Sequence, residues 1–312
     1  MKIDIFSHIL PKKYRDGVEK KFIAPPSERS SVESENRAII DLDVRFRVMD
    51  RYPEVVQVLT VSLPPLEASV KPKDAVGLAK TANDELAELT AKYPDRFVGA
   101  VASLPLSNIN AALKEIDRAC IDLKLKGIQM FTNNYGDTLD NPKFKPIYEK
   151  MVQYDLPIWI HPWAGKERGE PVFGWPYETA AAMLKLVAAG TFNDFPDLKV
   201  ITHHSGSMIS FFPYRIQWML PDMIHPGLVP NPLDHFRKLY NDTATYGHTP
   251  ALMCAYSFFG ADHLLFGTDA PLGPQYGLTA ETIASVEKMG IPENEKEQIF
   301  TQNAVGLLNI AL

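Results

Sequence analysis

The feature that most limits what this chain can fold into is a regular alternation of short apolar or β-branched segments with helical segments. Strands are predicted at residues 1–8, 55–62, 97–104, 127–131, 157–161, 198–203, 239–245 and 264–268. Helices are predicted at residues 41–51, 74–93, 108–125, 143–154, 178–192, 208–220, 250–259, 279–289 and 292–310. About eight strands separated mostly by helices are typical of a (β/α)8 TIM barrel, so the sequence predicts this α/β fold. A doubly wound sheet is the alternative, although no glycine-rich phosphate loop follows the first strand.

The chain is predicted to be a single domain over residues 1–312. Its 312 residues are 46% hydrophobic, which is enough to bury a sizeable core. No low-complexity tract or linker divides it. Residues 12–37 are polar and contain Pro25 and Pro26 before a serine- and glutamate-rich patch, so we expect a long loop or lid insertion there. Asp74 is expected to be the N-cap of the helix at 74–93.

Composition excludes several classes of protein. The formal net charge is -6 and no lysine- or arginine-rich run is present, so we expect no nucleic-acid partner. Cys120 and Cys254 are too few and too far apart for a disulfide scaffold or a cysteine zinc site. The N-terminus lacks an apolar signal core, and no apolar run is long enough to span a membrane. We therefore expect a cytoplasmic protein with no membrane partner.

Side chains suited to catalysis follow the carboxyl ends of the predicted strands, where barrel enzymes build their active sites. They are His8, His161, the pair His203 and His204, and Asp269. Two neutral imidazoles and a carboxylate are a common ligand set for a catalytic divalent metal. Singly, each histidine is explained as well by a hydrogen-bonded, half-buried side chain, and Asp269 by a turn. Together, at the ends of separate strands, they predict one metal site at the rim of the barrel.

The sequence resembles the decarboxylase branch of the amidohydrolase superfamily, and above all the aminocarboxymuconate-semialdehyde decarboxylases. The resemblance covers almost the whole chain. In order, it rests on MKIDIFSHILP, VRFRVMD, YPDRFVGAVASLP, GIQM, IHPW, LKVITHHSGSMISFFPYRI, YNDTA, LLFGTDAPLG and QNAVGLL. It implies a metal-dependent TIM barrel, in agreement with the alternation of strands and helices.

The resemblance also implies roles for individual residues. His8, His161 and Asp269 would be metal ligands. His204, which stands where relatives carry the histidine of an H-G-G-G motif, would be the catalytic histidine that moves the proton, and Asp269 is the alternative proton donor. His203 lies one residue earlier and is expected to point to the opposite side of the strand.

Substrate contacts are implied for two arginines. Arg45 would pair with a substrate carboxylate, and Arg215 would reach the active site of the neighbouring subunit in a homodimer; the bidentate fork of arginine suits both. A solvated helix charge at Arg45 and a surface ion pair at Arg215 are the simpler alternatives. Trp175, with Trp163 and Phe173, would form the apolar wall of a flat pocket, or would only pack a loop against the rim.

Residue 6 departs from the family pattern. Relatives have His-x-His or Glu-x-His at the first strand, whereas this chain has Phe6, which cannot donate an electron pair. Asp4 is not expected to substitute, because it lies a full strand repeat deeper. Three outcomes follow: a three-ligand metal site, a weakened site that is filled only with substrate, or a pocket that has lost its metal. For a retained metal, zinc is the first candidate and manganese the second.

The sequence therefore predicts a metal-dependent, non-oxidative decarboxylase that acts on a small unsaturated or aromatic carboxylic acid. One alternative is a hydrolase or hydratase of the same superfamily acting on a lactone, an amide or a carbon–carbon bond, because the fold alone does not select the reaction. A second alternative is a non-catalytic binding protein descended from such an enzyme, which the loss of a ligand at Phe6 would allow.

Overall fold

The computed structural model describes residues 1–23, 36–62, 64–134, 136–163, 171–223 and 231–311. Its parallel strands form two sheets, one in the order β1-β2-β3 and one in the order β4-β7-β8-β9. The strands are β1 (Lys2–Ile9), β2 (Val55–Val61), β3 (Phe97–Ala100), β4 (Ile128–Phe131), β7 (Ile158–His161), β8 (Val200–Thr202) and β9 (Tyr240–Asn241). The short antiparallel pair β5 (Asn133–Asn134) and β6 (Asp137–Thr138) follows β4.

Single bridges and backbone hydrogen bonds join these sheets into a ring. Ala102 bridges to Ile128 between β3 and β4, and Leu264 bridges to Asn241 of β9. The segment 264–268 then reaches β1, where the amide of Ile5 donates to the carbonyl of Phe266 over 3.0 Å. The segment 264–268, predicted to be a strand, thus forms a single β-bridge and individual hydrogen bonds instead of a continuous strand. It closes the ring between β9 and β1. The predicted TIM barrel is confirmed.

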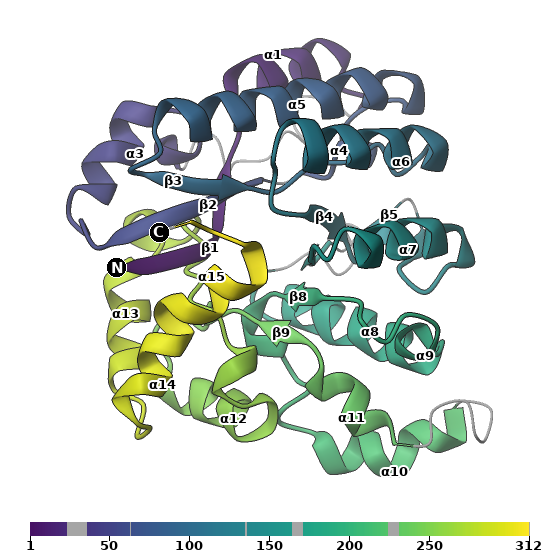
Figure 1. Ribbon diagram of the computed structural model, residues 1–312, viewed down its shortest axis with the longest axis vertical. Helices are drawn as coiled ribbons and strands as arrows, with labels where there is room; N and C mark the ends of the chain where they lie inside the picture. Colours follow the sequence, from purple (N-terminus) through teal and green to yellow (C-terminus); the bar gives the residue numbers. More distant parts are fainter. Residues whose placement is uncertain (24–35, 63, 135, 164–170, 224–230, 312) are drawn as a thin grey trace.

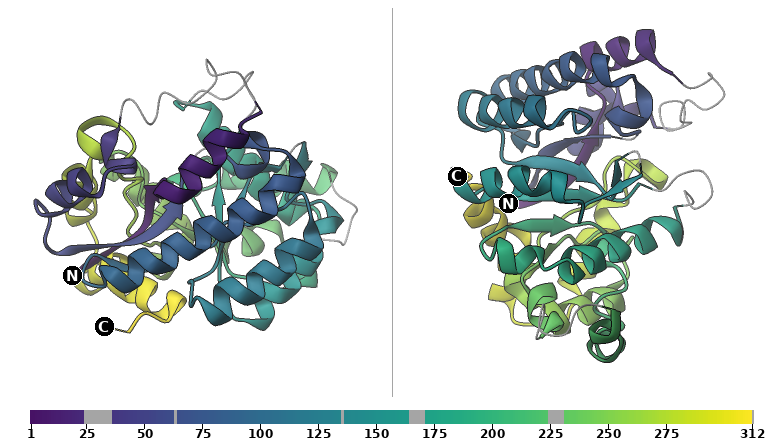
Figure 2. Two further views of the ribbon diagram at one scale, coloured as in Figure 1. Left: turned by 90° about the horizontal axis from the view of Figure 1, so that it is seen from above. Right: turned by 90° about the vertical axis from the view of Figure 1, so that its right-hand side faces the viewer.

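Helices cover the outside of the barrel (Figure 1; Figure 2). They are α1 (Lys12–Lys21), α3 (Leu42–Met49), α4 (Leu66–Ser69), α5 (Pro72–Lys92), α6 (Ile109–Asp117), α7 (Lys145–Gln153), α8 (Gly174–Ala188), α9 (Thr191–Asp194), α10 (Pro213–Met223), α11 (Pro232–Arg237), α12 (Thr249–Phe259), α13 (Thr279–Glu287), α14 (Glu293–Glu297) and α15 (Asn303–Leu308). The two termini lie close together (Figure 2), and the hydroxyl of Thr301 donates to the carbonyl of Met1. Among the described residues, no helix combines the length and the apolar character needed to cross a bilayer.

Two local predictions are wrong. Residues 12–21 form α1 instead of a loop, and only Tyr14 of this polar helix is buried. Glu85 of α5 accepts hydrogen bonds from the amides of Lys13 and Tyr14, so the cap of α1 comes from a distant helix that sequence patterns cannot locate. Residues 24–35, with Pro25 and Pro26, lie outside the described residues. Helix α5 begins at Pro72, so Asp74 lies in its first turn and is not its N-cap.

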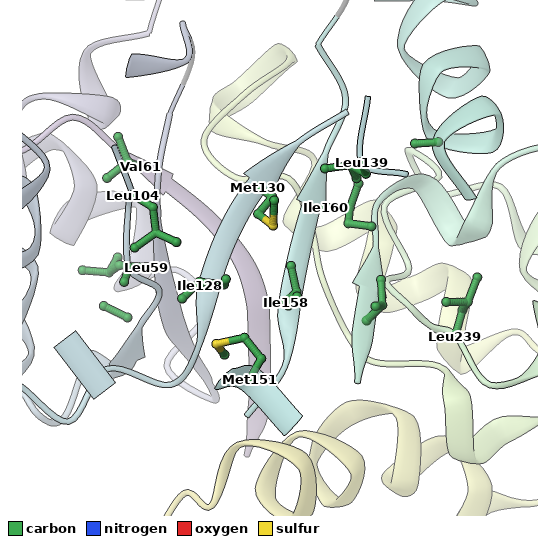
Figure 3. Packing of buried hydrophobic residues seen from close by; sticks show 14 of the residues in the cluster. Leu59, Val61, Leu104, Ile128, Met130, Leu139, Met151, Ile158, Ile160 and Leu239 are labelled. Carbon is green, nitrogen blue, oxygen red and sulfur yellow. The ribbon is translucent and has the colours of Figure 1, made fainter. Parts of the chain in front are cut away.

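Side chains on the outer face of the barrel pack under the helices. On β4 and β7 they include Ile128, Met130, Ile158 and Ile160 (Figure 3). Trp159 alternates with these isoleucines on β7 and belongs to a second cluster, together with Ile3 and Ile5. Because side chains alternate along a strand, His161 projects on the same side of β7 as Trp159. The sequence of β7 therefore places His161 at the inner rim of the barrel.

A β-bulge changes the alternation in β1. Asp4 pairs with Gln57 but Ser7 pairs with Leu59, so one extra residue of β1 lies between these pairs. Consequently Ile5 and Phe6, which are adjacent in sequence, join the same buried cluster. The bulge re-aims the strand end that carries Phe6 and His8.

Candidate active site

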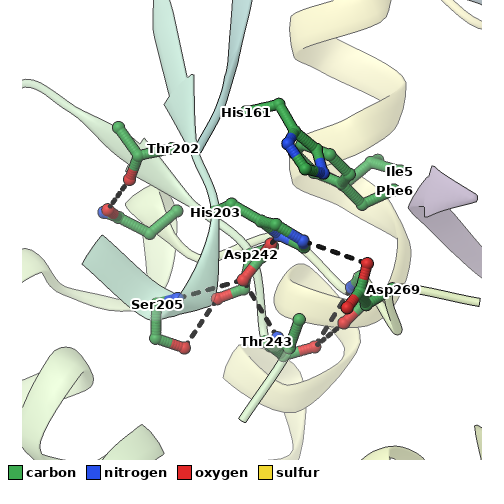
Figure 4. A network of polar contacts seen from close by, with 12 residues as sticks. Ile5, Phe6, His161, Thr202, His203, Ser205, Asp242, Thr243 and Asp269 are labelled. Carbon is green, nitrogen blue, oxygen red and sulfur yellow. Dashed lines mark hydrogen bonds and ion pairs between the residues drawn. The ribbon is translucent and has the colours of Figure 1, made fainter. Parts of the chain in front are cut away.

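The carboxyl ends of the barrel strands bring five buried side chains together, of which Figure 4 labels His161, His203, Asp242 and Asp269. His8 comes from β1, His161 from β7, His203 from the residue after β8, Asp242 from the residue after β9, and Asp269 from the end of the 264–268 segment. Each is at most 2% exposed. Three of these residues, His8, His161 and Asp269, are the predicted metal ligands.

His161 has one ring nitrogen without a partner. Its Nδ1 lies 2.8 Å from the carbonyl oxygen of Pro162, which can only accept, so Nδ1 carries the proton. The lone pair is therefore on Nε2, which is buried and has no hydrogen-bond partner among the described residues. A buried acceptor without a donor is costly. Burial and the neighbouring histidines lower the pKa of His161 well below its ordinary value, which keeps the ring neutral.

His8 lies between a scaffold hydroxyl and the carboxylate. Its Nδ1 is 2.9 Å from Thr60 Oγ1 and its Nε2 is 3.0 Å from Asp269 Oδ1. His8, His161 and His203 each have one ring nitrogen that could bind a metal, and these three nitrogens lie within 4.8 Å of one another. An unpartnered imidazole lone pair beside a second imidazole and a carboxylate fits a divalent cation. Asp4, as expected, is not part of this group: its carboxylate accepts from Ser7, Thr268 and the amide of Phe6.

The prediction that His203 points away from the site is wrong. Its Nδ1 contacts Asp242 Oδ2 and its Nε2 lies 3.1 Å from Asp269 Oδ1. Although burial lowers the pKa of His203, the two carboxylates raise it to about 10. Burial would raise the pKa of Asp269, but His203 and His8 hold it well below its ordinary range.

The backbone after β8 explains this difference. His204, Ser205 and Ser207 have φ angles of 57°, 53° and 56°, and Gly206 has 67°. The chain thus leaves the extended conformation directly after His203, and the alternation of faces no longer applies. The rings of His203 and His204 stack with centroids 4.0 Å apart. His204 Nδ1 is buried without a partner among the described residues, and burial beside His203 lowers the pKa of His204 to about 3.

Comparison with known proteins identifies the family of the chain. A family model described as Amidohydrolase matches residues 36–310. The chain belongs to the amidohydrolase family. This membership confirms the resemblance seen in the sequence.

Named relatives of this amidohydrolase are decarboxylases. The chain is 28% identical over 337 residues to 2-amino-3-carboxymuconate-6-semialdehyde decarboxylase of Dictyostelium discoideum, covering 99% of this chain and 92% of the relative. A solved 2,6-dihydroxybenzoate decarboxylase in complex with 2,6-dihydroxybenzoate is 25% identical, with a TM-score of 0.82 and 99% of both chains covered. A dihydroxybenzoic acid decarboxylase from Polaromonas, solved with manganese and the inhibitor 2-nitroresorcinol, is 25% identical with a TM-score of 0.81, covering 99% of this chain and 96% of that one.

The predicted substrate residues of the amidohydrolase lie in three different settings. Trp175, on α8, is partly buried, and its ring centroid is 6.3 Å from that of His161. Arg45, on α3, is 2% exposed, and its guanidinium donates to Gln57 Oε1 and to the carbonyl of His8. Arg215, on α10, is exposed and forms no ion pair with the described part of the chain. Trp175 therefore lies near the imidazole of a predicted metal ligand, Arg45 contacts only the backbone of another, and Arg215 contacts neither.

Sequence reasoning missed two polar partners of this amidohydrolase site. Asp242 was assigned no role, although it stands in the YNDTA motif and directly follows β9. It accepts from the amides of Ser205 and Ala244, each over 3.0 Å. The hydroxyl of Tyr246 donates to Asp269 Oδ2 over 3.2 Å, and the Asp269 charge raises the pKa of Tyr246. The signal for Asp242 was its place after the next strand, which the overlong predicted strand 239–245 concealed.

Proposed function

We propose that this amidohydrolase is a metal-dependent, non-oxidative decarboxylase of a small aromatic or unsaturated carboxylic acid. The observation that carries this proposal is the buried Nε2 of His161, which has no partner among the described residues. The His161 ring lies 5.0 Å from that of His8, whose Nε2 contacts Asp269. The named relatives are decarboxylases, which favours loss of carbon dioxide over the hydrolysis or hydration of a lactone, an amide or a carbon–carbon bond.

His8, His161 and Asp269 would hold the divalent metal. Bound there, the metal supplies a Lewis acid that polarises the substrate carboxylate and its neighbouring oxygen. Zinc remains our first candidate because buried imidazoles suit it. Manganese is the second, since the Polaromonas decarboxylase was solved with manganese. We expect the carboxylate of Asp269 to balance part of the cation charge, because it is the acidic member of the set.

The reaction exchanges a carboxylate for a proton. The bond between the ring or chain carbon and the carboxylate breaks, carbon dioxide leaves, and the electron pair stays on the carbon, which takes up a proton. No oxidant or reductant is required. His204 is our candidate to carry this proton, because its Nδ1 has no partner among the described residues and the ring lies directly against His203. Asp269 remains the alternative.

Trp175 and Arg215 are our candidates to orient the substrate. Trp175 would form one wall of a flat pocket, since its ring lies near that of His161. Arg215 would reach the partner's site in a homodimer. Support for the dimer comes from large apolar side chains exposed around Arg215, with Phe211 71%, Tyr214 73% and Trp218 74% exposed; a second copy would cover this surface. The substrate role of Arg45 and a cytoplasmic location stay predictions.

The test combines metal analysis with a screen for carbon dioxide release from hydroxybenzoic and muconate-type acids. We expect the purified protein to carry a divalent metal, to lose activity on chelation, and to regain it with added zinc or manganese. His161→Ala should abolish metal retention and activity together. Full decarboxylase activity in a preparation verified to be metal-free would refute the proposal. Turnover of lactones or amides without carbon dioxide would favour the hydrolase, and metal binding without turnover the binding protein.

A further inference from the structure

Phe6 occupies a position inside the site where an electron-pair donor would be expected from the family pattern. Its side chain is fully buried, and its ring centroid lies 5.5 Å from that of His8, 5.9 Å from that of His161 and 4.0 Å from that of His203. A phenyl ring cannot bind a metal ion as these imidazoles can. If the site holds a metal, one ligand has to be supplied by another residue or is lost.

His203 has the surroundings of a metal ligand. Its Nδ1 contacts the buried carboxylate of Asp242, which two backbone amides fix in place. Metal-binding histidines usually donate the ring proton that faces away from the metal to such a carboxylate or carbonyl. His161 has the equivalent arrangement with the carbonyl of Pro162. In both residues Nδ1 is held by the scaffold and Nε2 faces the site.

The Nε2 atoms of two histidines meet at one carboxylate oxygen. His203 Nε2 lies 3.1 Å from Asp269 Oδ1, and His8 Nε2 lies 3.0 Å from the same oxygen. Both nitrogens thus point to the predicted ligand Asp269. The Phe6 ring lies almost parallel to the His203 ring, with an angle of 12° between them. This stacking restricts the rotation of the His203 ring, so that the residue that cannot bind a metal holds in place one that can.

We propose that His203 is a metal ligand of this chain and takes the place of the donor that is missing at Phe6. The ligand set would then be His8, His161, His203 and Asp269. This inference rests on the proposed metal dependence and extends it to a residue on another strand. His204 also brings a ring nitrogen to within 4.8 Å of ligand atoms of His203 and Asp269. Its Nδ1, however, contacts no acceptor among the described residues, so this ring is not oriented by the scaffold as the rings of His161 and His203 are.

A competing arrangement has the same residues, but His203 Nε2 carries a proton instead of binding the metal. His203 lies between the carboxylates of Asp242 and Asp269, so it could remain a fully protonated imidazolium beside a three-ligand metal. In that case His203 would repel the metal, and removing it would leave metal affinity unchanged or increase it. The two arrangements therefore predict opposite effects of the same substitution.

The experiment measures zinc affinity by competition with a chromophoric chelator, for wild type, His203→Ala and the control His248→Ala, which replaces an exposed histidine outside the site. Loss of a ligand should weaken zinc binding by at least about a hundredfold in His203→Ala, whereas His248→Ala should stay within about threefold of wild type. Asp242→Asn should lose on the order of 10–100-fold, because it removes the acceptor of the His203 ring proton. Zinc binding by His203→Ala that is equal to or tighter than in wild type would overturn the inference.

Two further measurements guard against misfolded variants. In wild-type protein with labelled histidine and bound zinc, nitrogen NMR should show His203 with Nδ1 protonated and Nε2 metal-bound; protons on both nitrogens would refute the inference without any substitution. The double variant Phe6→His/His203→Ala should recover zinc affinity that His203→Ala alone has lost, because residue 6 regains a donor. A wild-type protein that binds no zinc or manganese would instead refute the proposed function, so the two failures are distinguishable.

Discussion

Replacing Arg45 by methionine decides whether this arginine binds substrate or holds the end of β1. Arg45 Nε and Nη2 donate to Gln57 Oε1 over 3.0 and 2.8 Å, and Nη1 donates to the carbonyl of His8 over 2.7 Å. Burial lowers the pKa of Arg45 to about 10, which the charge of Asp4 partly offsets. In the described part of the chain no carboxylate bonds to the guanidinium, so its donors serve the backbone and an amide.

The expected loss of stability in Arg45→Met follows from the two hydrogen-bond acceptors that lose their donor. Arg45→Met leaves two buried oxygens without donors, at about 1–3 kcal/mol each. Relief from burying a charge offsets part of this loss. We therefore expect the free energy of unfolding to fall by about 3 kcal/mol. Because one of the two oxygens is the carbonyl of His8, metal affinity should fall as well.

The assay is urea denaturation of the metal-loaded protein, compared with Arg47→Met, an exposed arginine on the same helix. Arg47→Met should change the free energy of unfolding by less than about 0.5 kcal/mol. Once the loss of metal in Arg45→Met is corrected by added zinc, KM for the carboxylic acid should be close to wild type. Unchanged stability together with a KM raised tenfold or more would refute this reasoning and support the sequence-derived role in carboxylate binding.

Three further predictions concern other residues. His204→Ala should leave the melting temperature nearly unchanged and reduce kcat by on the order of 10²–10⁴-fold, as expected for a proton-transfer group; an active variant would exclude that role. Burial raises the pKa of Glu67 from 4.5 to about 7, so the folded state binds the proton more tightly, and wild type should lose up to about 3 kcal/mol of stability as the pH rises through this interval. Glu67→Gln should lack this loss, and stability curves that run parallel would contradict it. Mixed dimers of inactive Arg215→Ala and inactive His204→Ala subunits should regain part of the activity, and hybrids shown to form without recovery would place Arg215 outside the partner's site.

The sequence was sufficient for the barrel because its signals are local and repeated. Strand and helix periods recur along the chain, and several strands carry a polar side chain at or just after their carboxyl end, as at His161 and His203. His161 could be placed at this rim because it ends the regular strand β7. His8 could be placed there because it lies near the carboxyl end of β1, although the bulge within β1 was not predicted. Trp175 follows the same strand as His161 and lies near its ring. Here the linear order of the chain contains the information needed.

Prediction failed where a contact between distant elements decides the local conformation. Helix α1 depends on Glu85, more than 70 residues away in the chain, for its first amides. The bulge in β1 re-aims Phe6 and depends on pairing with β2. Neither contact leaves a periodic trace in the nearby sequence, so polarity suggested a loop and alternation suggested a regular strand.

His203 shows why a site is harder to predict than a fold. Alternation assigned it to the wrong face because that rule holds only while the backbone stays extended, and here four successive residues after His203 have positive φ. What then orients the ring is a set of partners from three other strand ends: Asp242, Asp269 and Phe6. A carboxylate on each ring nitrogen and an aromatic ring against one face leave the imidazole one orientation, with Nε2 toward the predicted metal ligands. The missing donor at Phe6 and the proposed metal-binding role of His203 therefore both involve the stacking contact between these two rings. Neither residue can be interpreted without the other.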